Sequence, residues 1–531
     1  MSTVNAQESK GFYKLSWLQR IGFGSGDLAQ NLIYQTISMY LLFFYTDIFG
    51  LKAAHAATMF GVVRFIDVLW DPIVGTFIDK HNPKLGKYRS YLVFAGLPLT
   101  ILAILCFWDG MANADYTIKL IYAYITYVGL SMLYTLINVP YGALNSSLTR
   151  DTNEITILTS VRMFMANVGG LLVSAGIPIL VAVMAGITEV EDLPIKMALF
   201  MGLGSLPSFI FMPLVPAIKR TVGKKNMFYI FLSVGIVGMA MLYLITKTMN
   251  MEENMTLIYV AQFIKSTGVI VATGYMWALV PEVISYGEYT TGKRISGIVN
   301  ALTGIFFKAG MAMGGIVPGF VLAICGYQSA AERIGEFKEK SNAITEGINS
   351  LINSTNDLST EALELLKSAI PYYDQGAGIL GKVSEMIEVH STLPTDPKAW
   401  FLTMLIFALT GLVLLIFCFS QCKERVVMDS KETENVKVSD LWKEFGHNKP
   451  LRIIAFFFIT AFAMMSVGNA AGAYYMNNLQ SQPALVQEGI LWLVCVIPAA
   501  LLLLAMWIIS KYELTDEKID KINQEIEARN K

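Results

Sequence analysis

The sequence predicts an all-α membrane protein with twelve transmembrane helices. Its 531 residues are 54% hydrophobic and only 15% charged, whereas a soluble domain usually carries about 25% charged residues. The apolar residues gather in runs of roughly 20, the length that a helix needs to cross the hydrocarbon core. Lipid offers no partners to free backbone groups, so we expect each run to be a helix.

The apolar runs divide the chain into parts that can be named in order. The expected spans are about 21–47, 53–79, 91–108, 118–145, 160–186, 195–217, 227–247, 255–284, 296–326, 399–419, 451–476 and 487–510. We therefore expect an N-terminal segment (1–20), five spans (21–186), four spans (195–326), a soluble insert (327–398), a two-span hairpin (399–476) with a long loop (422–452), a last span (487–510) and a tail (511–531).

Lys and Arg residues predict the orientation of the spans. If the N-terminus is inside, the inner segments together hold 26 of the 40 basic residues. The short outer loops hold at most one each, at Lys52, Lys119, Lys196 and Lys247. Because inner loops are enriched in Lys and Arg, both termini are expected to be cytoplasmic, in a multi-pass protein of the inner membrane.

Composition also excludes some functions. The 40 basic and 41 acidic residues nearly cancel, so we expect no nucleic-acid partner. Five cysteines among 531 residues form no disulfide framework. The four histidines fall in loops or at span ends and show no metal-ligand spacing. We expect no enzyme activity, no cofactor and no obligatory protein partner beyond membrane lipid.

The second expected span carries three charged residues on one face. Arg64, Asp67 and Asp71 are spaced i, i+3 and i+7, so they share one side of a helix. Charges within a span are costly and usually functional. Two carboxylates one turn apart suit a small hard cation or a shared proton. The structural alternative is an Arg–Asp pair that only fixes helix packing.

Single charges also lie in other spans. Lys308 is the only charged residue of ALTGIFFKAGMAMGGIVPGF and lies about 18 Å from the inner end of its span, by the helical rise per residue. It needs a carboxylate on another helix or a polar ligand as its partner. Lys265 could instead reach a membrane interface. Trp277 is expected either to stack on a sugar or to pack against other helices.

Several motifs resemble one family of transporters. GFGSGDLAQN, RFIDVLWDPIVGTFIDKHNPKLGKYRSYLVF, NVPYGALNSSLTRDTNEITILTSVRM and WALVPEVISYGEYTTGKRISGIVNALTGIFFKAG are similar to the glycoside–pentoside–hexuronide:cation symporters, the melibiose permease group of the major facilitator superfamily. The likeness covers nearly the whole chain except the insert. It implies the major facilitator fold, with two six-helix halves around a central cavity.

The resemblance also implies site residues. The cation-site positions of the family fall on Asp67, Asp71, Thr135 and Asn138, with Arg64 as a supporting charge. The sugar-contacting positions fall on Asp27, Arg162, Trp277 and Lys308. Asn138 replaces a family carboxylate, so Na⁺ and H⁺ both stay open as the coupling ion. Gly26 and Gly142 replace a family lysine and tryptophan, which leaves the particular sugar open.

The order of two spans differs from that of the family. The superfamily joins its sixth and seventh spans by a long charged loop, but here that loop lies at 422–452. Its flanking runs, 399–419 and 451–476, resemble the family's sixth and seventh spans. A natural reordering, an artefact of sequence assembly and a mistaken alignment are the three possible accounts. If the hairpin has moved, 399–419 should pack with 21–186, and 451–476 with 195–326 and 487–510.

These patterns favour a symporter that couples Na⁺ or H⁺ to the import of a sugar or glycoside by alternating access. One alternative is a transporter of another amphiphile such as a lysolipid. A second is a membrane sensor that binds its ligand through 327–398 without transport. A membrane enzyme is the least favoured, because no metal or nucleophile constellation is present.

Overall fold

The computed structural model describes residues 14–328, 393–424 and 445–525, apart from short gaps within these ranges, and a few residues between 340 and 350. The gaps are 82, 84, 112, 150–151, 188, 190–192, 252, 278, 292–295, 478, 480–481, 516, 520 and 523. Most of the expected soluble insert and most of the loop 422–452 therefore lie outside the described residues.

All regular structure within the described ranges is helical. The first part of the chain forms α2 (Trp17–Thr36), η1 (Ile37–Leu41), η2 (Phe44–Ile48), α3 (Ala53–Lys80), α4 (Ser90–Phe94), α5 (Gly96–Leu105), η3 (Asp109–Met111), α6 (Tyr116–Leu148) and α7 (Thr152–Met184). The second part forms α8 (Ile195–Phe211), η5 (Met212–Leu214), α9 (Val215–Val222), α10 (Lys224–Thr248), α11 (Met255–Met276), α12 (Leu279–Thr291), α13 (Ser296–Ile324), α16 (Pro397–Gln421), α18 (Lys449–Asn477), α19 (Ala484–Leu491), η6 (Trp492–Val496) and α20 (Ile497–Ser510).

Eight helical stretches in the described residues are long and apolar enough to cross a membrane. Two further stretches, Ser90–Leu105 and Ile195–Phe211, are apolar but shorter. The expected spans 21–47 and 53–79 correspond to α2–η1–η2 and to α3, which are helical in the structure. The charges of α3 lower its apolar character, as the sequence indicates. The chain is thus a multi-pass, all-helical membrane protein over its described part.

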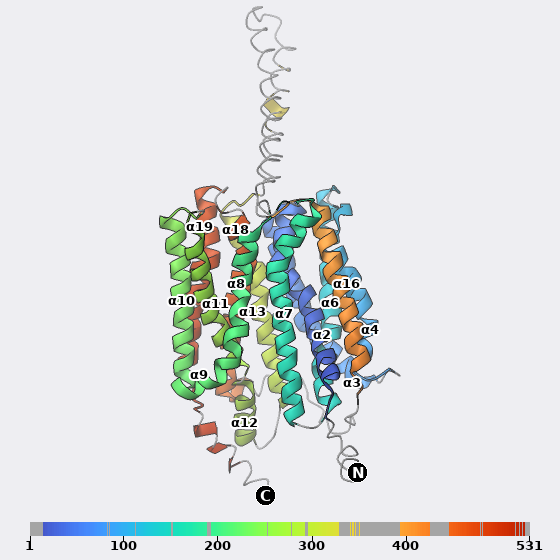
Figure 1. Cartoon of the computed structure of the whole chain (residues 1–531), viewed down its shortest axis with the longest axis vertical. Helices are drawn as coiled ribbons and strands as arrows, with labels where there is room; N and C mark the ends of the chain where they lie inside the picture. Colours follow the sequence, from blue (N-terminus) through green and yellow to red (C-terminus); the bar gives the residue numbers. More distant parts are fainter. Residues whose placement is uncertain are drawn as a thin grey trace, which may run out of the picture.

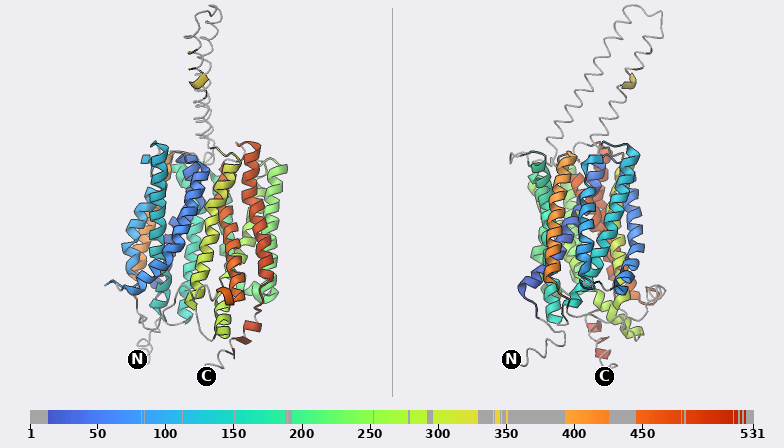
Figure 2. Two further views of the ribbon diagram at one scale, coloured as in Figure 1. Left: turned by 180° about the vertical axis from the view of Figure 1, so that it is seen from behind. Right: turned by 90° about the vertical axis from the view of Figure 1, so that its right-hand side faces the viewer.

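The helices form two groups that lie side by side (Figure 1). In one group, α16 packs against α2, α5 and α7, and α3 packs against α6. In the other, α18 packs against α13 and α20, and α10 packs against α11. Figure 2 shows the orange α16 among the blue and cyan helices of the first group. These are the neighbours that the sequence analysis expects for 399–419 and 451–476 if the hairpin has moved.

Close backbone approaches explain why α16 and α18 take these neighbours. A Cβ atom on Gly22 of α2 would lie 2.4 Å from Cβ of Gln421, at the end of α16. A Cβ on Gly314 of α13 would lie 2.6 Å from Cβ of Ser466 on α18. Small residues let helices approach closely in a membrane, where packing rather than water exclusion drives their association.

The two groups meet along two lateral seams and at one end of the bundle. The seams are α3 against α13 and α7 against α8. We call the end where α2 begins and α20 ends the terminal end, and the other end the insert end (Figure 1). At the insert end, a Cβ on Gly319 of α13 would lie 2.5 Å from Cβ of Ala57 on α3. The halves are therefore tightly packed there.

Polar contacts also join the halves at the insert end. The Tyr327 hydroxyl donates to the carboxylate of Asp47, and the hydroxyls of Thr46 and Tyr474 lie 2.7 Å apart. Asp47 and Thr46 belong to η2, whereas Tyr474 belongs to α18 and Tyr327 directly follows α13. These contacts hold the insert end closed.

Candidate functional site

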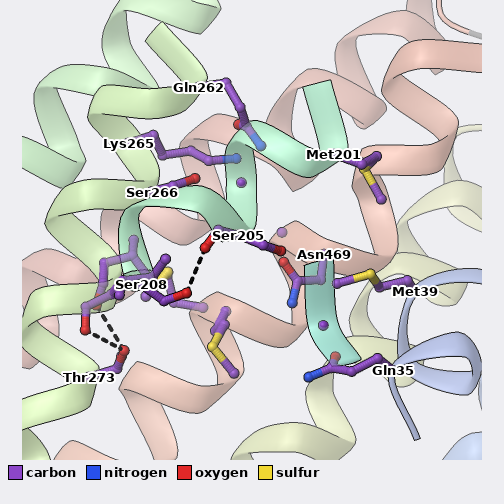
Figure 3. Close-up of a pocket in the computed structure, with 18 of the residues that line it drawn as sticks. Gln35, Met39, Met201, Ser205, Ser208, Gln262, Lys265, Ser266, Thr273 and Asn469 are labelled. Carbon is purple, nitrogen blue, oxygen red and sulfur yellow. Dashed lines mark hydrogen bonds between the residues drawn. The ribbon is translucent and has the colours of Figure 1, made fainter. Parts of the chain in front are cut away.

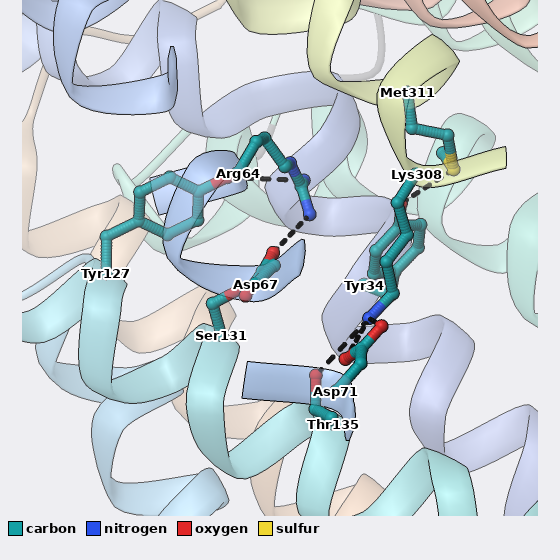
Figure 4. A network of polar contacts seen from close by, with 9 residues as sticks. All are labelled: Tyr34, Arg64, Asp67, Asp71, Tyr127, Ser131, Thr135, Lys308 and Met311. Atoms are coloured by element: carbon teal, nitrogen blue, oxygen red, sulfur yellow. Dashed lines mark hydrogen bonds and ion pairs between the residues drawn. The ribbon is translucent and has the colours of Figure 1, made fainter. Parts of the chain in front are cut away.

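The charged face of α3 is built into a network between the halves (Figure 4). Arg64 Nη1 donates to Oδ2 of Asp67 at 3.1 Å. The hydroxyl of Ser131, on α6, donates to the other carboxylate oxygen of Asp67 at 2.5 Å. Asp67 is only 2% exposed, so its charge is balanced by Arg64 rather than by water. The Arg64–Asp67 pair is therefore a real contact of the fold.

Arg64 also interacts with the hydroxyls of Tyr127 and Tyr34. Its second terminal nitrogen donates to the hydroxyl of Tyr127 at 3.3 Å. Its Nε atom is buried without a hydrogen-bond partner among the described residues. An unsatisfied buried donor is costly. The ion pair with Asp67 therefore has to hold the guanidinium in place although one of its donors lacks a hydrogen bond.

Lys308 of α13 joins this network from the other half. Its ammonium donates to both carboxylate oxygens of Asp71. The hydroxyl oxygen of Thr135, on α6, lies 3.5 Å from the same nitrogen. The partner that the sequence required for Lys308 is thus a carboxylate of the second expected span. We call Arg64, Asp67, Asp71 and Lys308 the interhalf cluster.

Asn138 lies on α6, three residues beyond Thr135, and is half-buried. In the described part of the chain, no hydrogen bond connects it to the interhalf cluster. The four expected cation-site positions are nevertheless on two adjacent helices, since α3 packs against α6.

Asp27 and Arg162 form a separate ion pair within the first half. Arg162 Nε donates to Oδ2 of Asp27, and the guanidinium lies over the ring of Tyr141 at 4.8 Å from its centroid. A Cβ atom on Gly26 would lie 2.5 Å from the same ring. This contact excludes a side chain such as lysine at position 26 while Tyr141 keeps its place.

A cavity with a volume of about 370 Å³ lies between the halves. Helices α2, α7, α8, α11 and α18 supply most of its wall, with further residues from α10 and α20. Its polar lining residues are Gln35, Asn167, Ser205, Ser208, Gln262, Lys265, Ser266, Thr273 and Asn469 (Figure 3). We call this space the central cavity.

The expected substrate contacts do not all surround the central cavity. Trp277 lines it, is 42% exposed and packs edge-on against Phe458 at 5.0 Å between ring centroids. Asp27, Arg162 and Lys308 are absent from its described lining and are paired with carboxylates or a guanidinium instead. In this conformation the structure separates the ion pairs from the cavity.

The sequence analysis did not predict most of the residues that line the central cavity. A membrane interface was one location considered for Lys265, but its side chain is 9% exposed and lines the central cavity instead. The reason is that α11 continues for more than two turns on either side of it. A usable signal was present, because Gln262, Lys265, Ser266 and Thr273 recur at helical spacing on one face of an otherwise apolar run.

Comparison with known proteins identifies the family. A family model described as MFS/sugar transport protein matches residues 22–193, 188–354 and 375–487. The uncharacterized symporter YnaJ of Bacillus subtilis is 39% identical over 404 residues, covering 60% of this chain and 85% of YnaJ.

Two other relatives have names that state a substrate. A glucuronide carrier protein homolog of Escherichia coli is 28% identical, covering 59% of this chain and 85% of the relative. An isoprimeverose transporter of Lactiplantibacillus pentosus is 26% identical, with 59% and 81% covered. The resemblance inferred from the motifs is confirmed: the chain belongs to the MFS/sugar transport protein family, among the glycoside, pentoside and hexuronide symporters of the major facilitator superfamily.

Proposed function

We propose that this protein is a symporter that couples the inward movement of Na⁺ or H⁺ to the import of a sugar or glycoside. The observation that carries the proposal is the position of the Lys308 ammonium between the halves. It sits against both oxygens of Asp71 and 3.5 Å from the Thr135 hydroxyl. Carboxylate and hydroxyl oxygens are also the ligands of a small hard cation.

The coupling step follows from competition at Asp71. Na⁺ bound by Asp67, Asp71, Thr135 and Asn138 would replace the ammonium as the partner of the carboxylate. A proton on Asp71 would neutralise it and release Lys308 in the same way. Either ion changes a contact that joins the two halves, as alternating access requires.

The released Lys308 would then be available to the substrate. We propose that Asp27, Arg162, Trp277 and Lys308 hold the sugar by charge-assisted hydrogen bonds and by stacking. Trp277 already lines the central cavity. Relatives named as a glucuronide carrier homolog and an isoprimeverose transporter support a sugar or glycoside as the cargo.

We also propose twelve spans in two six-helix halves, with both termini in the cytoplasm and the insert 327–398 outside. The inner-membrane location is supported by a relative named as an inner membrane symporter. The orientation rests on the excess of basic residues in the segments at the terminal end. The insert is assigned no binding role in this proposal.

The relocated hairpin is part of the proposal and has two supports. The first is the packing of α16 and α18 with opposite halves. The second is a gap in the alignment with YnaJ. The alignment has 404 positions but covers only 60% of this chain, which is about 319 of its 531 residues. About 85 positions of the relative are therefore aligned with no residue of this chain. That is close to the length of segment 399–476.

The test is an uptake assay in proteoliposomes with a panel of labelled glycosides. A Na⁺ gradient, a pH gradient, both and neither are imposed in turn. We expect accumulation above the external concentration under one of the two gradients and only equilibration without them. Uptake that equilibrates equally under all four conditions would contradict coupling, and competition by lysolipids but not by sugars would contradict the cargo.

A further inference from the structure

Lys265 differs from the half-buried cations inside the described helix bundle. It is 9% exposed, and within the described ranges no carboxylate lies at ion-pair distance from it. Its neighbours include the ring of Phe200, whose centroid is 5.9 Å from Nζ, and the thiol of Cys495, with which it interacts electrostatically. By contrast, Arg64, Arg162 and Lys308 each bond a carboxylate. The ammonium of Lys265 is therefore left to be balanced by something else.

The central cavity offers no such balance. Its described lining contains one ionisable side chain of either sign, Lys265, and no Asp or Glu. An uncompensated charge away from water is costly, and a charge within a span usually faces a partner or a ligand. The lining of the cavity is thus positively charged at Lys265 and neutral at its other described residues.

The groups around Lys265 suit a hydroxylated ligand. Gln262 lies one turn before it and is 5% exposed; its Nε2 donates to the carbonyl of Phe200 at 3.3 Å, but its Oε1 is buried without a partner. Ser205 and Asn469 enter the same space from α8 and α18 (Figure 3). The volume of about 370 Å³ falls among small-molecule sites, which range over about 300–1,000 Å³.

We propose that the central cavity binds an acidic sugar, with the carboxylate or sulfonate of the substrate on the ammonium of Lys265. The hydroxyl groups of the substrate bond Gln262, Ser205 and Asn469. This inference rests on the proposed sugar transport and adds the charge of the substrate to it. Of the sugar contacts proposed above, Trp277 lines this cavity, whereas Asp27, Arg162 and Lys308 would reach the substrate only once their ion pairs are released. A neutral sugar would leave the Lys265 ammonium without a counter-charge in the cavity, so it binds more weakly.

The test compares acidic sugars with closely matched neutral ones. Binding of methyl β-glucuronide, its neutral 6-amide, methyl β-glucoside and the 6-sulfonate of the glucoside is measured on the purified full chain by calorimetry, together with uptake in proteoliposomes. The corresponding galacturonide and galactoside pair is included. Variants are Lys265→Gln, which removes the charge, Lys265→Arg, which keeps it, and Lys398→Gln as a control on an exposed lysine at the start of α16.

We expect at least one acidic ligand to bind at least about tenfold more tightly than its neutral partner, as for a charge-assisted hydrogen bond. The preference should vanish in Lys265→Gln and persist in Lys265→Arg and Lys398→Gln. Comparison of the sulfonate with the carboxylate shows whether binding depends on the geometry of the acidic group. Acidic preference without any gradient-driven uptake would reject the proposed symport but keep this inference.

Other outcomes overturn the inference. Equal binding of acidic and neutral partners does so, as does an acidic preference that survives in Lys265→Gln, or the absence of measurable binding by every acidic ligand. Coupled uptake of neutral glycosides alone would leave the proposed symport intact. If Lys265→Gln does not fold, loss of the preference in Lys265→Arg combined with normal folding also counts against the charge.

Discussion

The interhalf cluster and the central cavity balance their charges in different ways. In the cluster, each cation has a carboxylate from the protein: Arg64 bonds Asp67, and Lys308 bonds Asp71. In the cavity, Lys265 has none among the described residues, and the other polar lining groups are neutral. The charges of the first region are balanced without a ligand, whereas the charge of Lys265 in the second region is not.

Under the proposed function, this difference would let one protein bind two kinds of ligand. An ion that enters the cluster must displace or neutralise an existing partner, so its binding changes a contact between the halves. A substrate that enters the cavity meets unsatisfied groups and needs no displacement. Coupling in this picture comes from the cluster and selectivity comes from the cavity, and variants can separate the two contributions.

The largest effect is expected for Asp71→Asn. The amide keeps the shape but removes the charge that Lys308 and the ion compete for, so concentrative uptake should fall at least about 100-fold, consistent with loss of a charge-assisted bond. Substrate binding and exchange should remain measurable. The assay is gradient-driven uptake beside counterflow, with the exposed Asp115→Asn as control. Undiminished accumulation would remove Asp71 from the coupling site.

Lys308→Ala should come next, with a loss of uptake of about tenfold or more. The variant leaves Asp71 without its partner, and the two halves lose the contact that responds to the ion. Because Asp71 then no longer competes with an internal cation, ion binding measured without substrate should become tighter. Lys398→Ala is the matched control. Normal coupled uptake in Lys308→Ala would show that the pair only supports packing.

Asp67→Ala tests stability more than transport. It leaves the buried Arg64 without a counter-charge, which typically costs about 3–5 kcal/mol, whereas replacing both partners by apolar residues can be nearly neutral. We therefore expect a lower melting temperature for Asp67→Ala and recovery in Arg64→Met/Asp67→Leu, measured on protein in detergent. Asp115→Ala removes an exposed helix cap and should cost only about 1 kcal/mol. Equal melting of Asp67→Ala and wild type would contradict a buried pair.

The interhalf cluster was also easier to predict from the sequence than the central cavity. Arg64, Asp67, Asp71 and Lys308 stand out because ionisable residues are rare within apolar runs. Their mutual contacts could be anticipated, since a midplane lysine needs a carboxylate. Which cation pairs with which carboxylate could not be anticipated, because the pairing depends on how α13 is rotated against α3 and α6.

The cavity was harder to predict because neutral residues build most of it. Gln262, Ser205 and Asn469 come from three helices that are distant in the sequence, and each alone resembles an ordinary polar residue that packs between helices. Only the packing of α8, α11 and α18 brings them to one space. The neighbours of α16 and α18 followed from family likeness, not from hydropathy, since any apolar helix satisfies hydropathy alone.

Gly314→Val should affect both regions at once. Its side chain would push against Ser466, where α13 meets α18, and overpacking of this kind typically costs about 1–3 kcal/mol. Helix α13 carries Lys308, and α18 carries Asn469 of the cavity, so ion dependence and substrate affinity should weaken together with stability. Gly304→Val is the control, because nothing lies within 4 Å of a Cβ there. If only one region responds, the two regions do not share this support.

The smallest effect is expected for Gln262→Leu, and it separates the regions most clearly. The change removes a buried amide that faces the cavity while roughly keeping its volume, so the KM for the substrate should rise about tenfold, as for one lost hydrogen bond of about 1.4 kcal/mol. The dependence of uptake on the ion should stay as in wild type, because Gln262 lies outside the interhalf cluster.

Gln30→Leu is a close control: Gln30 is 1% exposed, its amide has no partner among the described residues, and it does not line the cavity. Removing such an unsatisfied amide should leave KM unchanged and stability equal or higher. A shift in ion dependence for Gln262→Leu, without one for Gln30→Leu, would show that the cavity takes part in coupling, and the division between the two regions would have to be abandoned.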